Sequence, residues 1–150
     1  MYKKILVAID DSKTAEKALD EAIRLAAALG GELCIAYAAD ESPLAQHGMG
    51  LGSYIDVDKV KLEIREMGKV LLDKAVSKAK AAGCKAEPLM IESTRRRVAE
   101  MIADAARDWS ADLVVAGAHG VRGFERMLVG SVAENLTRIC TTSLLLVRQV

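Results

Sequence analysis

One segment of the sequence, residues 117–131, has the residue types and spacing to bind an anion. It reads G-x-x-G, nine further residues and then G-S, with glycines at 117, 120 and 130 followed by Ser131. Glycine allows positive φ and has no Cβ to hold a ligand away, so backbone N–H groups can converge on phosphate oxygens. The helical pattern that follows would add its amino end, which attracts anions. The spacing therefore predicts a phosphate cradle.

The end of this cradle segment also fits a second interpretation. Ser131-Val132-Ala133-Glu134 is a possible capping box, in which the serine hydroxyl accepts a backbone N–H and Glu134 reaches back. A cap alone does not require the four glycines that occur across residues 117–130, so the phosphate interpretation is preferred. Neither G-x-x-x-x-G-K-[ST] nor G-x-G-x-x-G occurs in the chain, and Gly48-x-Gly50-x-Gly52 is interpreted as a flexible loop.

Three further groups of residues are candidates for a role in a site. Asp10, in Asp10-Asp11-Ser12, could bind a ribose or a phosphate-bound Mg²⁺, or could cap the next helix as its neighbours could. His119 could donate to a phosphate or fill a turn. No nucleophile or carboxylate is placed beside it by the sequence, which disfavours acid–base catalysis. Arg95-Arg96-Arg97 is interpreted as a solvated face at the start of a helix.

The elements that would position these residues alternate along the chain. Apolar runs of strand length occupy 5–9, 33–38, 88–91, 113–116 and 144–147. Between them, apolar residues at helical spacing predict helices over 15–29, 60–82, 98–109 and 132–139. This order requires a mainly parallel sheet with helices on both faces. Ligands bind beyond the carboxyl ends of such strands, which is where Asp10 and the cradle segment lie.

The composition restricts the class of protein. A chain of 150 residues is expected to form one domain, residues 1–150, and no apolar run approaches the ~20 residues of a membrane helix. Basic and acidic residues number 21 each and aromatic residues make up 3%, which disfavours nucleic acid as a partner. The three cysteines lack metal spacing and are expected as buried, reduced thiols. Without a signal-peptide pattern, a cytoplasmic protein with no membrane partner is expected.

These segments together resemble the universal stress protein family, in its ATP-binding type, over essentially the full length. The resemblance rests on the opening Ile5-Leu6-Val7-Ala8-Ile9-Asp10-Asp11-Ser12, the G-x-x-G-(nine)-G-S segment and the closing Leu145-Leu146-Val147-Arg148. It implies an α/β fold with a Rossmann-like, doubly wound sheet of five parallel strands in the order 3-2-1-4-5. It also implies an ATP site between the first and fourth strands, and a homodimer joined through the last strand.

The resemblance further implies which residues hold ATP, or ADP or AMP in its place, with Mg²⁺ bound through the phosphates. Ala8, Ile9 and Asp10 would meet the nucleoside, and the backbone at Ala38 would read the adenine edge. The ribose and phosphates would be wrapped by Gly117, Ala118, His119, Gly120, Val121, Arg122, Gly123, Gly130, Ser131, Val132 and Ala133.

The expected function is that of an ATP-binding stress-response protein, a regulatory module that acts through its nucleotide-bound state. Two alternatives stay open: a slow ATP hydrolase or nucleotide-dependent transferase, and a dimeric interaction module with a vestigial nucleotide site. The sequence assigns no catalytic and no metal-binding residue, and it names no protein partner.

Overall fold

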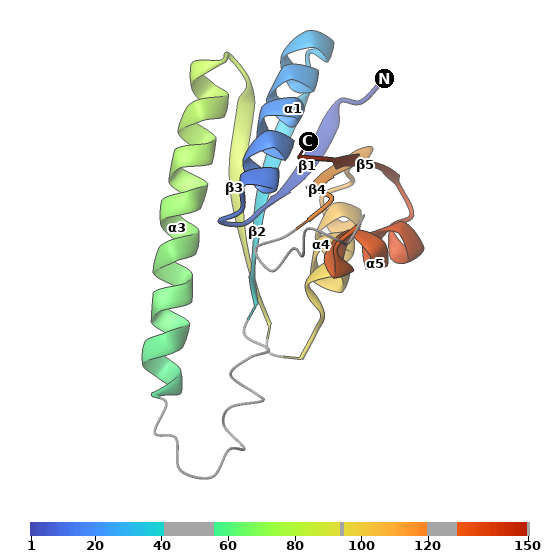
Figure 1. The fold of residues 1–150 in the computed structure, drawn as a ribbon. Helices are drawn as coiled ribbons and strands as arrows, with labels where there is room; N and C mark the ends of the chain where they lie inside the picture. The colour runs from blue at the N-terminus through green and yellow to red at the C-terminus, as the bar shows by residue number, and fades with distance from the viewer. Residues whose placement is uncertain (41–55, 94, 120–128, 150) are drawn as a thin grey trace.

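Strands and helices alternate along the chain in the computed structural model, which describes residues 1–40, 56–93, 95–119 and 129–149 (Figure 1). The five strands form one parallel sheet in the order β3-β2-β1-β4-β5, which confirms the predicted architecture. The elements are β1 (Lys4–Ile9), α1 (Lys13–Leu29), β2 (Glu32–Asp40), α3 (Val57–Ala81), β3 (Lys85–Ser93), α4 (Val98–Asp108), β4 (Leu113–Gly117), α5 (Ser131–Ile139) and β5 (Ser143–Val147).

Helices cover both faces of the sheet. α1 and α3 lie on one face, and α4 and α5 lie on the other (Figure 1). Successive residues of β1 enter different cores, because side chains alternate along a strand. Ile5 and Val7 belong to the cluster under α1 and α3, whereas Leu6 belongs to the cluster under α4 and α5. The continuous apolar runs of the sequence therefore reflect burial on both faces.

The edge strand β3 is more than twice as long as the sequence predicted. The apolar run at 88–91 marks only its middle, and the strand spans Lys85–Ser93. It pairs with β2 on one side only, and Lys85, Glu87 and Pro88 are exposed along it. Edge strands tolerate proline and charged residues, so a search for continuous apolar residues does not find their ends. The inner strand β2 also extends beyond the predicted 33–38, to Glu32–Asp40, because its two terminal residues are charged and do not belong to the apolar run.

The three cysteines are free thiols, as predicted. Cys34 and Cys84 are buried, whereas Cys140, at the end of α5, is only half-buried. Burial, with a smaller contribution from the Glu87 carboxylate, raises the pKa of Cys34 to about 12. Such a thiol stays protonated at neutral pH, so Cys34 behaves as a small apolar residue of the core.

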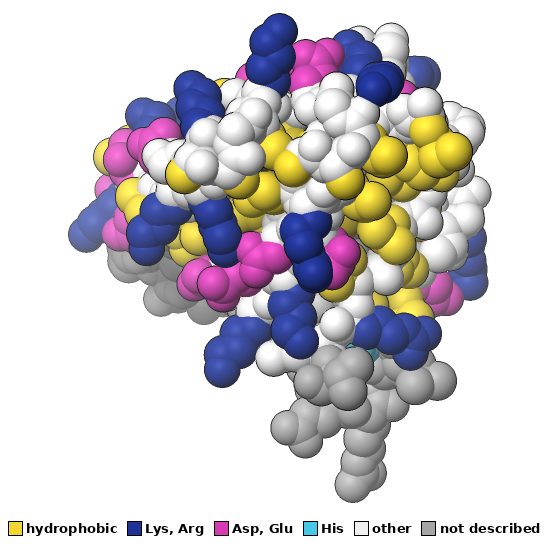
Figure 2. All heavy atoms as spheres, turned by 90° about the horizontal axis from the view of Figure 1, so that it is seen from above, with side chains coloured by type: hydrophobic (Ala, Val, Ile, Leu, Met, Phe, Trp, Pro, Cys, Tyr) yellow, Lys and Arg dark blue, Asp and Glu magenta, His cyan; other side chains and the backbone are white. Residues whose placement is uncertain are grey.

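The described surface carries charges of both signs. On the face seen from above, Lys and Arg are interspersed with Asp and Glu, with hydrophobic side chains between them (Figure 2). This mixture agrees with the equal totals of basic and acidic residues, 21 each. Among the helices of the described ranges, none is long and apolar enough to cross a membrane.

The helix α3 approaches the sheet closely because residue 68 has no side chain. A Cβ built at Gly68 would lie 2.6 Å from Cδ1 and 2.7 Å from Cε1 of Tyr37, and 2.7 Å from Cε of Met90. Tyr37 is a buried member of the core under α1 and α3, so its ring has no free space to move into. Gly68 therefore sets the distance between α3 and β2.

Gly68→Ala is expected to destabilise the protein although alanine is the better helix former. Alanine contributes about 1 kcal/mol through helix propensity, whereas overpacking costs about 1–3 kcal/mol, so a net loss of about 1 kcal/mol is expected. Urea unfolding measures the difference. Lys69→Ala, at a side chain that is 65% exposed on the same helix, is the control and should change little. A Gly68→Ala protein more stable than the wild type would contradict the close contact.

Candidate functional site

The carboxyl ends of β1, β2 and β4 meet at one edge of the sheet, and the described site residues gather there. β1 is central and pairs with β2 on one side and β4 on the other. Asp10 follows β1, Ala38 lies near the end of β2, and His119 follows β4. Gly130 returns to the same edge through a hydrogen bond to Ala118. Segments far apart in the sequence are thus brought together where ligands bind in this class of sheet.

Four residues of the predicted cradle, Gly120, Val121, Arg122 and Gly123, lie outside the described residues. The glycine-containing loop around 48–52 lies outside them too. The predicted role of the four cradle residues in phosphate binding therefore stays a prediction.

Asp10 stabilises the turn before α1 rather than the helix itself. Its Oδ1 accepts a hydrogen bond from the Ser12 N–H at 2.8 Å, while the Ser12 hydroxyl accepts one from the Ala15 N–H at 3.0 Å. The cap of α1, which the sequence left open among three residues, is therefore Ser12. Asp10 is half-buried, and its Oδ2 is not part of this turn.

Negative charge is concentrated at the ends of β1 and β2. Burial raises the pKa of Tyr37, and the carboxylates of Asp10, Asp11 and Asp40 raise it further. Each of these carboxylates is thus near enough to Tyr37 to disfavour a negative charge on its phenol oxygen. Among the described residues, however, no cluster of three or more His, Cys, Asp and Glu side chains could hold a metal ion.

Small side chains face α4 and α5 near this edge. Ala8 and Ala38 are half-buried and pack toward the cluster under these helices, whereas Ile9 packs toward α1 and α3. Because side chains alternate along β2, Asp40 lies on the same face as Ala38. The alanines present only small side chains on this face, and Ile9 can offer it only backbone atoms.

Ala118 connects the cradle segment to β5. Its N–H donates to the Val147 carbonyl at 2.8 Å, and its carbonyl accepts from the Gly130 N–H at 2.6 Å. The Ala118 side chain is buried. The N–H groups of Ala118 and Gly130 are therefore engaged within the protein, and a ligand at this edge would meet other N–H groups.

The free N–H groups are those at the start of α5. The N-cap is Gly130, with φ −73° and ψ 166°, and no side chain caps the helix. The capping-box interpretation is wrong, because Ser131 is already the first helical residue and Glu134 pairs with Arg138 at 2.9 Å instead of reaching back. The first turn, with the buried Ala133, therefore presents backbone N–H groups without a capping side chain. Such an end can bind an anion.

Gly117 is required by packing and not by its backbone conformation. Among the described glycines only Gly30 and Gly83 have positive φ. A Cβ at Gly117 would lie 2.9 Å from Cγ2 of Thr14, 3.2 Å from the Thr14 carbonyl carbon and 3.2 Å from the His119 carbonyl oxygen. Thr14 is buried in the first turn of α1. The missing side chain thus lets α1 approach the end of β4.

His119 carries a polar atom without a partner. Its Nδ1 is buried and makes no hydrogen bond to any residue of the described ranges. An unpaired buried nitrogen costs about 1–3 kcal/mol. A hydrogen bond to a ligand would satisfy that atom.

A pocket of about 280 Å³ opens between the amino ends of α4 and α5. We call it the arginine pocket; it is lined by Asp40, residues 95–99, Ser131, Val132 and Asn135. The sequence indicated a solvated face for Arg95–Arg97, and all three are exposed, but they also line one pocket with Ser131 and Val132 of the cradle segment. The position of these arginines follows from the strand order rather than from the local sequence. α4 connects β3 to β4 and therefore crosses β2 and β1, which brings its start near α5.

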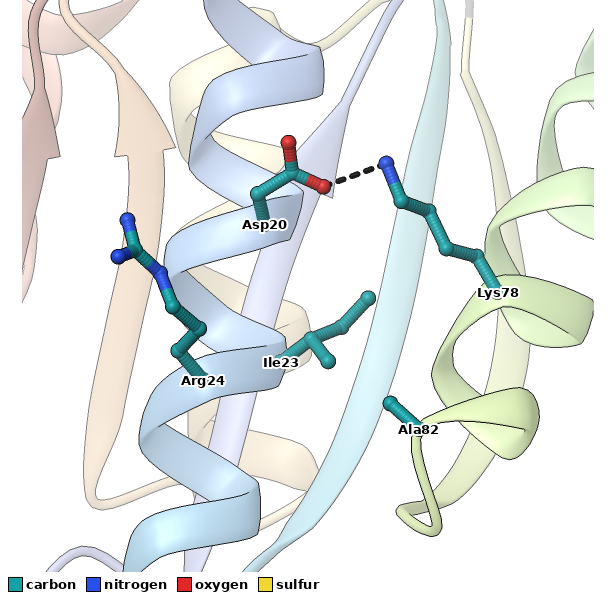
Figure 3. Close-up of a pocket in the computed structure, with 5 residues that line it drawn as sticks. All are labelled: Asp20, Ile23, Arg24, Lys78 and Ala82. Carbon is teal, nitrogen blue, oxygen red and sulfur yellow. Dashed lines mark ion pairs between the residues drawn. The ribbon is translucent and has the colours of Figure 1, made fainter.

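A second hollow, of about 380 Å³, lies between α1 and α3 (Figure 3). Lys78 pairs with Asp20 across it at 2.5 Å, while Arg24 points away from that pair and binds Glu21. Its cations are thus paired with carboxylates of the protein. We interpret this hollow as a seam between two helices.

Comparison with known proteins agrees with this arrangement. The model of the universal stress protein family matches residues 1–148. The chain belongs to the universal stress protein family. It is 30% identical to the universal stress protein YxiE of Bacillus subtilis, over 99% of this chain and 100% of that protein.

Two solved structures of universal stress proteins extend the likeness to three dimensions. A family member from Burkholderia pseudomallei is 32% identical with a TM-score of 0.77, over 97% of this chain and 96% of that one. A universal stress protein in complex with cAMP is 27% identical with a TM-score of 0.70, over 99% and 98% of the two chains. The family predicted from the sequence is therefore confirmed, whereas its ATP-binding type stays a prediction.

Gly117→Ala is expected to cost about 1–3 kcal/mol of unfolding free energy, because the new methyl group overlaps Thr14. Thr14→Ser removes the Cγ2 atom that lies closest to the added Cβ. The double variant should therefore regain part of the loss. A double-mutant cycle from urea unfolding should give a coupling of at least about 0.5 kcal/mol. Strictly additive losses would show that the steric contact is not the cause.

Proposed function

We propose that this universal stress protein binds an adenine nucleotide, ATP above all, and acts as a regulatory module through its nucleotide-bound state. The observation that carries the proposal is the start of α5, which has no side-chain cap and follows a glycine of the cradle segment. Free N–H groups and the helix dipole favour a phosphate there. No side chain of the described residues caps the start of α5, so this helix end is open to a ligand.

Other features of the edge support the same ligand. The buried Nδ1 of His119 lacks a partner among the described residues and could donate to a ligand oxygen. Ala8 and Ala38 offer small apolar side chains, against which a flat base could pack, on the face shared with α4 and α5. The complex of a 27%-identical universal stress protein with cAMP supports an adenine nucleotide as the ligand.

The charges of the edge suggest how the nucleotide is oriented. Asp10, Asp11 and Asp40 make the ends of β1 and β2 negative, which repels phosphates. The neutral nucleoside is therefore expected beside β1 and β2, and the phosphates beside α5. Any Mg²⁺ would be bound through the phosphates, and we assign no catalytic residue. The cytoplasmic location stays a prediction of the sequence.

ATP is expected to raise the melting temperature of the purified protein. A ligand that binds only the native state stabilises it by about 2.7 kcal/mol at a hundredfold excess over Kd. GTP should give a smaller shift, because the Ala38 backbone is expected to read the adenine edge. Differential scanning fluorimetry with both nucleotides measures this. Equal shifts would contradict the adenine preference, and no shift with either would favour the interaction module with a vestigial site.

We also propose that the protein forms a homodimer through β5. This strand is an edge of the sheet, paired only with β4. Residues 144–147 are Leu-Leu-Leu-Val, without the proline or charges that protect the opposite edge at β3. A two-fold axis would pair β5 with its copy in a self-complementary contact.

Leu145→Lys is expected to convert the dimer into a monomer, because it places a charge on the exposed edge strand. Leu145 is half-buried, and a lysine there can extend its amine to solvent. Light scattering at micromolar concentration measures the change. Leu89→Lys is the matched control, since it makes the same change at a half-buried position of the other edge strand and should stay dimeric. A monomeric wild type would overturn the proposal, and a dimeric Leu145→Lys would place the interface elsewhere.

A further inference from the structure

The edge strand β5 and the candidate nucleotide site are connected at Ala118. The Ala118 N–H donates to the carbonyl of Val147, the last residue of β5, at 2.8 Å. The Ala118 carbonyl in turn accepts from the N–H of Gly130, the N-cap of α5, at 2.6 Å. Two consecutive hydrogen bonds therefore run from the end of the edge strand to the residue that precedes α5.

One peptide group faces both Ala118 and the open edge of the sheet. The Val147 carbonyl points toward β4, where it accepts the Ala118 N–H. In a planar trans peptide the N–H points opposite to the C=O, so the Arg148 N–H, in the same peptide group, points away from β4. That side of β5 is the open edge of the described sheet. A second copy paired there would accept the Arg148 N–H and thereby fix the orientation of the Val147 carbonyl.

A side-chain contact connects the same end of the chain to the other half of the site. The Thr14 hydroxyl donates to Oε1 of Gln149, two residues beyond the end of β5, at 3.3 Å. Thr14 is buried in the first turn of α1, directly after the Asp10 turn, and it packs against Gly117. Residues 147–149 therefore bond to the segment that follows β4 and also to the segment that follows β1.

Pairing of β5 with a second copy changes how well this region is ordered. Arg148 and Gln149 are exposed, so little burial holds the end of the chain in a single copy. A partner strand adds hydrogen bonds to it. A site that is already ordered binds its ligand more tightly, because less conformational entropy is lost on binding. By linkage, each bound nucleotide then strengthens the dimer by the factor by which dimerisation strengthens its binding.

We propose that nucleotide binding and β5 pairing are coupled through the peptide group between Val147 and Arg148, so that the dimer binds ATP more tightly than the monomer. This inference rests on the proposed function, with its nucleotide site at the carboxyl edge and its dimer through β5. It gives the nucleotide-bound state an output, because ATP then sets the fraction of the protein that is dimeric.

The first test needs no substitution. Sedimentation velocity over a dilution series gives the dissociation constant of the wild-type dimer, without nucleotide and with saturating ATP. ATP should lower this constant at least about fivefold for each nucleotide bound. Calorimetry on the same protein measures ATP binding independently of the dimer.

The second test compares two substitutions at one exposed position. Arg148→Pro removes the N–H of the peptide group but keeps its carbonyl. Arg148→Ala removes the same guanidinium and keeps the N–H, so it is the matched control. At concentrations where the wild type is dimeric, Arg148→Pro should bind ATP at least about fivefold more weakly, as should Leu145→Lys. Arg148→Ala and Leu89→Lys should stay within about twofold of the wild type.

The outcomes separate this inference from the proposed function. If ATP binds but leaves the dimer constant unchanged, or binds Arg148→Pro as tightly as the wild type, the inference is overturned while nucleotide binding stands. A dimeric wild type that binds no ATP overturns both. A wild type that stays monomeric with and without ATP overturns the inference and the dimer but not the nucleotide site. The unliganded variants should melt with the wild type at concentrations where all are monomeric, which separates lost coupling from lost folding.

Discussion

The whole arrangement depends on a parallel sheet whose two faces are both buried under helices. Each strand returns through a helix to the same starting edge, so all carboxyl ends lie together at the other edge. Side chains within the strands are committed to the two cores, as Ile5, Leu6 and Val7 show. Polar groups from several segments can meet only where the strands end. Asp10, His119 and the start of α5 occupy that place because of this constraint.

The charges at the carboxyl edge of the sheet are unevenly distributed. Carboxylates gather where β1 and β2 end, and they act together on Tyr37. On the side of α4 and α5, helix amino ends and three arginines line one pocket, in which Asp40 is the only carboxylate among the lining residues. A ligand with one neutral end and one strongly anionic end matches this division, whereas a uniformly charged polymer does not. The same division explains why the equal totals of acidic and basic residues say little about the site.

How well the sequence predicted the structure depended on whether the signal was local. The end of α1 at Gly30, in the left-handed conformation, and the strand β4 follow from nearby residues and were predicted. The cap of α5 was not, because Gly130 and Ser131 fit either role until the chain path is known. Gly117 was chosen from the sequence for the approach of a ligand, but its packing against Thr14, distant in sequence, gives it a structural reason that no local pattern shows. Arg95–Arg97 join the pocket through the course of α4 across the sheet, which no local pattern encodes.

The two edges of the sheet differ in a way that bears on assembly size. Pro88, Lys85 and Glu87 lie exposed along β3, so that edge resists extension by another strand. β5 has no such protection in its apolar residues 144–147. If both edges were adhesive, copies could add head to tail without limit and grow into a fibre. With one adhesive edge, a pair of copies consumes every available edge, and growth by strand addition ends at two.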